Sequence, residues 1–61
     1  MKFYFTFGFG QANENCFTVI EATNREAARE EMNRRHGRQW AFCYDSAEEA
    51  GVERFGLKEI H

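Results

Sequence analysis

Hydrophobic residues alternate with smaller or more polar ones, with a period of two, in residues 2–9 (KFYFTFGF). This alternation predicts a β-strand with two unlike faces, Phe3, Phe5, Phe7 and Phe9 on one and Tyr4, Thr6 and Gly8 on the other. Residues 16–22 are rich in β-branched and aromatic types and predict a second strand. Residues 10–15 have the composition of a turn, so we expect the two strands to form an antiparallel hairpin.

The pattern becomes helical after residue 22. Thr23-Asn24-Arg25-Glu26 matches a capping box, in which the Thr23 hydroxyl accepts a hydrogen bond from the Glu26 amide and the Glu26 side chain reaches back. Residues 24–36 contain no glycine or proline, and Gly37 stands where a helix commonly ends, so this segment is predicted to be helical. Its narrow apolar stripe suits a helix that lies close to a sheet: Ala28, Met32 and His36, widened by Ala27.

The remaining sequence predicts two more strands and a short helical turn. Alternation returns in residues 39–44, which predicts a third strand with Trp40, Phe42 and Tyr44 on one side and Ala41 and Cys43 on the other. Residues 45–51 read as a helical turn that Asp45 or Ser46 caps and Gly51 stops. Residues 52–60 supply a last short strand, interrupted by Gly56. The order ββαβ(β) predicts one α+β domain over residues 1–61, an antiparallel sheet with one helix packed on one face.

Composition excludes several classes of protein. The 61-residue chain has only two cysteines, Cys16 and Cys43, which do not form a CxxC pair, so neither a disulfide-rich scaffold nor a structural zinc site is expected. The formal net charge of −2 disfavours binding to double-stranded nucleic acid through overall charge. No apolar stretch approaches the ~20 residues of a membrane-spanning helix, and the first residues lack the pattern of a signal peptide, so we expect no membrane association.

Glycine, arginine and aromatic residues suggest a ligand site. Gly8 and Gly10, with Gln11, can form a backbone nest for a phosphate, although the same glycines also suit a bulge and a hairpin turn. Arg38 follows the predicted helix and can pair with a phosphate, or it belongs to a cationic helix end. Aromatic side chains can stack on a base. The predicted ligand-binding residues are Tyr4, Gly8, Gly10, Gln11, Arg38, Trp40 and Tyr44.

The strands carry aromatic residues on both faces. A sheet that one helix covers leaves its second face open, and Tyr4, Thr6 and Tyr44 are candidates for that face. Exposed apolar surface of this kind marks an interface, and a domain this small gains from self-association, so we expect a homo-oligomer. The alternative is that these rings complete a monomeric core.

The sequence gives little support for catalysis. Cys16, Cys43 and His36 have no motif that would bring a thiolate and its base together, and cysteines in strands are usually small buried apolar residues. The acidic residues 45–53 lack the alternating ligand spacing of a calcium loop. We therefore expect a protein that is not an enzyme and has no metal or cofactor.

Four segments, YFTFGFGQ, VIEA, NREAARE and HGRQWAFCY, occur in this order along the chain. Together they resemble a group of short proteins from bacteriophage and prophage genomes. The resemblance extends from Tyr4 to Tyr44 and more loosely to Ile60. It implies a phage accessory gene whose product acts in the cytoplasm of the bacterial host, and some small phage proteins of this kind are anti-defence factors.

Two functions follow from the resemblance and the candidate site together. The first is a sponge that sequesters a host nucleotide immune signal without altering it, with the nucleotide held in pockets between subunits. The alternative is a protein-directed inhibitor that binds a host defence or CRISPR effector protein through its aromatic face or its charged helix. A structural accessory domain without a ligand is a third possibility.

Overall fold

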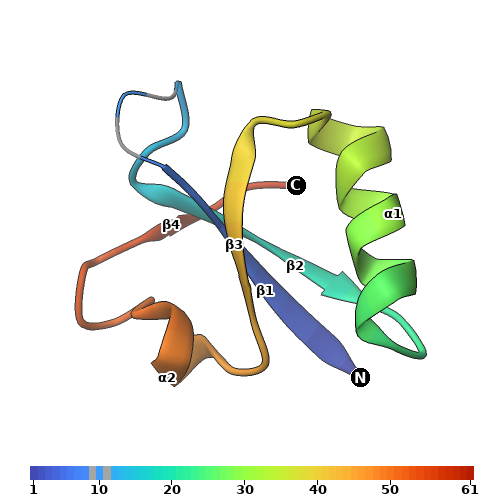
Figure 1. Cartoon of the computed structure of the whole chain (residues 1–61). Coiled ribbons are helices and arrows are strands. Elements are labelled where there is room, and N and C mark those ends of the chain that lie inside the picture. Colours follow the sequence, from blue (N-terminus) through green and yellow to red (C-terminus); the bar gives the residue numbers. More distant parts are fainter. Residues whose placement is uncertain (9, 11) are drawn as a thin grey trace.

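The computed structural model describes residues 1–8, 10 and 12–61, and it is a four-stranded sheet between two unequal helices (Figure 1). The α+β class predicted from the sequence is confirmed. The elements follow in the order β1 (Lys2–Phe7), β2 (Cys16–Glu21), α1 (Arg25–His36), β3 (Trp40–Tyr44), α2 (Ala47–Ala50) and β4 (Lys58–Glu59). Phe9 and Gln11, which the sequence places in the first strand and the phosphate nest, lie outside the described residues.

The strand order is β3-β1-β2-β4, with β1 at the centre. β1 pairs antiparallel with both β2 and β3, so the predicted hairpin is present. β4 pairs with β2 in parallel, and the Ile60 amide continues the pairing by donating to the Phe17 carbonyl at 2.8 Å. The sheet is therefore mixed and not purely antiparallel as expected, because the chain crosses the second face of the sheet between β3 and β4.

The core lies between α1 and the phenylalanine face of β1. Phe3, Phe5 and Phe7 are buried there against Ala28 and Met32 of α1. Burying a phenylalanine or methionine side chain stabilises a fold by roughly 1.5–3 kcal/mol. The predicted apolar stripe of the helix is confirmed at Ala28 and Met32, each with an exposed fraction of 0%.

The helix begins one residue later than the sequence predicted. Asn24 is the N-cap, and its side-chain oxygen accepts a hydrogen bond from the Ala27 amide at 2.8 Å. The capping box with Thr23 as the cap is therefore wrong, because Asn24 holds the extended backbone that an N-cap requires and satisfies the orphan amide itself. Gly37 ends the helix with a positive φ of 62°, as expected.

A β-bulge separates Trp40 from the rest of its strand. Phe42 pairs with Thr6 but Trp40 pairs with Phe7, so the register shifts between them. Trp40 then packs on the α1 side, where its ring lies edge-on to Phe5 at a centroid distance of 5.0 Å. The expectation that Trp40, Phe42 and Tyr44 share one face is therefore wrong: the bulge interrupts the alternation, and Trp40 joins the core.

The short helix α2 and the turns after it pack on the face of the sheet away from α1. Ser46 caps α2 through a hydrogen bond from the Glu49 amide at 3.1 Å, and Gly51 ends it in the left-handed conformation. The stop at Gly51 was predicted, and Ser46 was one of the two caps that the sequence left open. The Leu57 amide then donates to the Val52 carbonyl at 2.9 Å, which turns the chain back toward β4. The second face of the sheet is thus partly covered and not fully open as the sequence suggested.

Candidate functional site

An apolar groove of about 290 Å³ lies on the face of the sheet away from α1. Thr6 and Gly8, at the end of β1, line it together with Phe42 and Tyr44 of β3. The segment after α2 closes the other side with Ala50, Phe55 and Leu57, and the β1–β2 connection contributes Glu14 and Asn15 at its rim. The groove exists because residues 50–57 fold back beside the edge of the sheet without covering it completely.

Two phenylalanines of this groove are strongly exposed. Phe42 has an exposed fraction of 59% and Phe55 of 66%. The Phe42 ring lies against Tyr44 at a centroid distance of 6.2 Å, and the guanidinium of Arg54 lies 5.4 Å above the Phe55 ring. Two large rings left in water beside an apolar hollow form a contiguous patch, and such patches on small proteins mark sites of interaction. We call this patch the aromatic groove.

Gly51 fixes the position of the Phe55 ring. Gly51 is buried and has a φ of +78°, and a Cβ atom built on it would lie 2.6 Å from Cε2 of Phe55. The ring therefore rests directly on the backbone of this glycine, which holds it at the groove although most of its surface faces water. A single glycine at the end of α2 thus allows both the turn and the aromatic wall.

The hollow of the aromatic groove is lined by no basic residue among the described ones, and the Arg54 guanidinium lies outside it, over the Phe55 ring. Among the described residues that line the hollow, Glu14 carries the one carboxylate, and there is no lysine, arginine or histidine. A phosphate ligand requires arginine, lysine or converging amides. The lining therefore matches an apolar or aromatic group and not a phosphate.

The predicted ligand residues are divided between the two faces of the sheet. Tyr4 and Tyr44 are paired across β1 and β3 on the groove side, and Gly8 lines the groove. Trp40 lies on the α1 side, where Arg29 lies 5.6 Å above its ring and Asn33 Oδ1 accepts from its Nε1 at 2.8 Å. The sheet therefore separates Trp40 from the two tyrosines.

The other predicted residues do not join the groove. Arg38 is exposed in the turn after α1 and is not among the residues that line it. Gly10 is exposed with a φ of +82°, the conformation of a turn glycine, and Gln11 lies outside the described residues. Phe55 and Leu57 were missed because only the fold-back after α2 brings them to the groove; the alternating pattern of the strands gives no signal for them.

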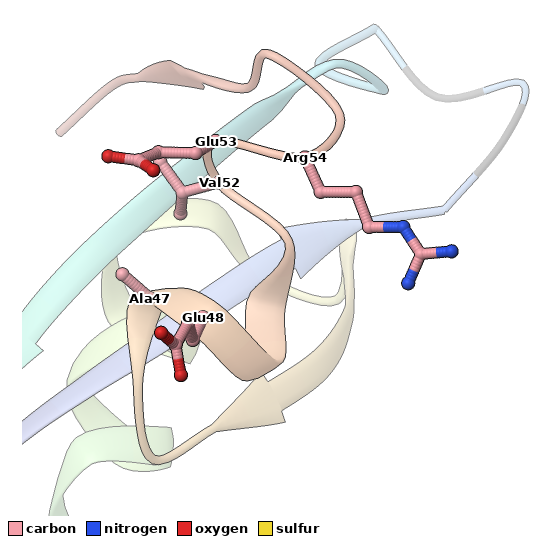
Figure 2. A pocket seen from close by; sticks show the side chains of 5 residues that line it. All are labelled: Ala47, Glu48, Val52, Glu53 and Arg54. Carbon is pink, nitrogen blue, oxygen red and sulfur yellow. The ribbon is translucent and has the colours of Figure 1, made fainter.

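Two further hollows contain charges of both signs. Ala47, Glu48, Val52, Glu53 and Arg54 line a hollow of about 600 Å³ beside α2, and in Figure 2 the Arg54 side chain extends away from Glu53. Arg25, Glu26, Arg29, Glu30 and Asn33 line the second, of about 560 Å³, on the surface of α1. Charged side chains line both hollows, and neither lining contains an aromatic ring.

The outer edge of β3 is protected. The Ala22 amide donates to the Met1 carbonyl. Because backbone N–H and C=O groups in an antiparallel ladder point alternately to the two neighbouring strands, those of Phe3 and Phe5 point to β2. Those of Tyr4 and Thr6 point to β3. Tyr44 and Phe42 therefore face β1, and the Cys43 carbonyl points outward, where Arg25 donates to it at 3.1 Å and also pairs with Asp45. With the bulge beside it, this edge is poorly suited to pairing with another strand.

The cysteines and the potential metal ligands show no reactive arrangement. Both cysteines are free, and burial raises the pKa of the Cys43 thiol, which the nearby Arg25 only partly opposes. The thiol is therefore protonated at neutral pH. Among the described residues no three histidine, cysteine, aspartate or glutamate side chains cluster in a way that could hold a metal ion.

Comparison with known proteins adds no assignment: no protein-family model matches the sequence, and no curated protein or solved structure matches the chain. In the part of the chain that the structure describes, no helix has the length and apolar character to span a membrane.

Proposed function

We propose that this protein acts by binding, without catalysis, and that the aromatic groove is its binding surface. The observation that carries the proposal is the exposure of Phe42 and Phe55 on both sides of an apolar hollow. Leaving these rings in water gives up the roughly 25 cal/mol that each Å² of buried apolar surface contributes. A partner that covers them gains this free energy on binding.

The groove favours a protein partner over a nucleotide. Protein interfaces are centred on aromatic anchors in apolar pockets, which is the composition found here. The nucleotide hypothesis places Arg38 at the phosphate and Trp40, Tyr4 or Tyr44 on the base, and Arg38 does not line the groove that Tyr44 lines. Of the two functions predicted from the sequence, we therefore propose the protein-directed inhibitor. Sequestration of a nucleotide, in a pocket between two subunits, stays a prediction.

Two observations favour binding without catalysis. The Cys43 thiol has a raised pKa, which makes it a poor nucleophile at neutral pH. His36 lies edge-on to Phe7 at a centroid distance of 5.3 Å and its Nε2 lies 3.5 Å from the Thr18 hydroxyl, so its ring is used in packing. The resemblance to phage proteins adds the proposal that the target is a defence protein of the bacterial host.

Photo-crosslinking tests this proposal. A benzophenone amino acid replaces Phe55 in one variant and Arg38 in a second, and both are incubated with lysates of several bacteria. We expect one stoichiometric crosslinked protein from the Phe55 position and none from Arg38. The unlabelled wild type should compete with this crosslink, and a Phe42→Ser, Phe55→Ser double variant should not.

The same reagents separate the alternatives. Native mass spectrometry with cyclic and ADP-ribose-type nucleotides detects a sponge, whose binding an Arg38→Ala substitution should remove. Sedimentation detects a homo-oligomer, the self-association predicted from the sequence. A nucleotide complex sensitive to Arg38→Ala, or a dimer that the double variant dissociates without any crosslinked partner, would overturn the assignment of the groove to another protein.

A further inference from the structure

Arg25, the first residue of α1, is bonded to the chain on both sides of Tyr44. Its Nη1 donates to the Cys43 carbonyl at 3.1 Å, and its Nη2 donates to Oδ1 of Asp45. The same guanidinium lies 5.7 Å from the centre of the Phe3 ring, which is buried in the core. One side chain of the helix thus joins β1, the outer edge of β3 and the residue that follows β3.

The helix itself does not favour an arginine at this position. The unpaired amides at the start of a helix carry a partial positive charge, so a cation in the first turn is unfavourable there. The last turn, where cations are favoured, contains Arg34, Arg35 and His36. A residue that conflicts with its own element indicates a role outside that element, and Arg25 has its bonds at the end of β3.

The chain that Arg25 holds leads into both walls of the aromatic groove. Because side chains alternate along a strand, Tyr44 points to the groove side of the sheet, where its ring lies 6.2 Å from that of Phe42. Asp45 connects β3 to α2, and the segment after α2 carries Phe55. The bonds of Arg25 therefore lie at the junction between the sheet wall and the opposite wall of the groove.

We propose that Arg25 is a positioning residue of the aromatic groove: it holds the end of β3 against α1 and thereby fixes Tyr44 and the start of the segment that carries Phe55. This inference rests on the proposed function, since it concerns the same binding surface. Arginine suits the position because its planar guanidinium presents several donors in a fixed geometry and can bond a carbonyl and a carboxylate at once. Lysine keeps the charge without this geometry.

Competition for the Phe55 crosslink tests this role. The unlabelled competitors are the wild type, Arg25→Gln, Arg25→Lys and, as the matched control, Arg34→Gln, which removes an exposed ion pair with Glu31 from the same helix. Urea unfolding first establishes that each variant is folded under the conditions of the assay. We expect Arg25→Gln to need an about two- to five-fold higher concentration than the wild type to halve the crosslink, the range for one exposed ion pair. Arg25→Lys should lie between the two, and Arg34→Gln should match the wild type.

The backbone amide signals of ¹⁵N-labelled protein give a readout that needs no partner. Phe42 and Phe55 lie in the groove and are not among the residues that Arg25 bonds, so a shift of their signals reports a change in the shape of the groove. We expect Arg25→Gln to shift both signals and Arg34→Gln to leave them in place. Asp45→Asn should shift them less, because the β3 carbonyl keeps its bond, and should have no further effect in the Arg25→Gln background.

The two readouts separate a failure of this inference from a failure of the proposed function. Competition by Arg25→Gln at the wild-type concentration, or unmoved signals of Phe42 and Phe55, would overturn the positioning role and leave the proposed function standing. Absence of a Phe55 crosslink in the wild type would contradict the proposed function. Shifted signals of Phe42 and Phe55 in Arg25→Gln would then still support the control of the groove's shape by Arg25.

Discussion

Gly51 is the residue on which the shape of the groove most depends. Its φ is positive, which a residue with a side chain rarely adopts, and a Cβ atom at this position would collide with the Phe55 ring. The other glycines of the described chain with a positive φ, Gly10, Gly37 and Gly56, have no atom within 4 Å of a built Cβ. A substitution at those positions therefore destabilises the fold only through the strained backbone conformation, without a steric clash.

A Gly51→Ala substitution is expected to destabilise the fold and to disturb the groove. The left-handed backbone costs alanine about 1–2 kcal/mol, and displacement of the Phe55 ring adds to it. Gly56→Ala is the matched control, since its φ is +61° and its surroundings are open. Urea unfolding measures both. Equal losses of stability would contradict the contact between Gly51 and Phe55.

Glu31 gives the protein an acid-sensitive contact. Hydrogen bonds from Arg34 and Arg35 lower its pKa from 4.5 to about 2. A carboxylate whose pKa is lower in the folded than in the unfolded chain stabilises the fold at pH values above the unfolded pKa. For Glu31 this stabilisation disappears as the pH falls from about 4.5 toward 2. A Glu31→Gln variant should therefore lose less stability than the wild type over this interval. Thermal unfolding at pH 5, 4 and 3 measures the difference, and parallel curves would contradict the ion pair.

At the level of elements, α1 is held by its N-cap as well as by its buried stripe. Asn24→Ala is expected to cost about 0.5–2 kcal/mol, because the Ala27 amide loses its acceptor. Thr23→Ala is the control and should cost much less, although the sequence alone assigned the cap to Thr23. Chemical denaturation of both variants decides between the two caps: a larger loss at Thr23 would restore the capping box.

The elements that alternate or repeat regularly are those that the sequence predicted. β1, the stripe of α1 at Ala28 and Met32, and the ends of α2 at Ser46 and Gly51 all follow from local patterns. Trp40 was assigned to the wrong face because a bulge adds one residue to the alternation. No residue in the segment WAFCY indicates a bulge at that position. Local pattern rules hold until the register shifts, after which only tertiary packing determines the face.

The candidate site was predictable only in part, for a related reason. Tyr4, Gly8 and Tyr44 lie on one side of the sheet because side chains along a strand alternate between its two faces. Phe55 and Leu57 belong to turns, and they reach the groove through the hydrogen bonds that fold residues 51–57 back on α2. The alternation of the strands therefore predicts only the part of the binding surface that lies on the sheet, and not the part formed by the irregular segment.

For the whole molecule, the two faces of the sheet have unequal cores. The α1 face buries Phe3, Phe5, Phe7 and Ile20 against the helix, whereas the described buried hydrophobic residues outside this cluster are Phe17 of β2 and Ala50 of α2. Regions with few buried apolar contacts open at lower free energy than the core. The segment 46–57 should therefore open without global unfolding, and the aromatic groove should open with it.

Hydrogen exchange tests this division of stability. We expect the amides of Ala50, Gly51 and Leu57 to exchange through a local opening that depends weakly on denaturant, and the amides of Phe5 and Met32 to exchange only through global unfolding. A ligand that binds the closed groove stabilises it by mass action, so the partner crosslinked at Phe55 should slow exchange in residues 46–57 and change α1 little. Exchange of both faces at one common free energy would show a single cooperative unit. The binding surface would then be preformed, and partner binding would not be coupled to closure of residues 46–57.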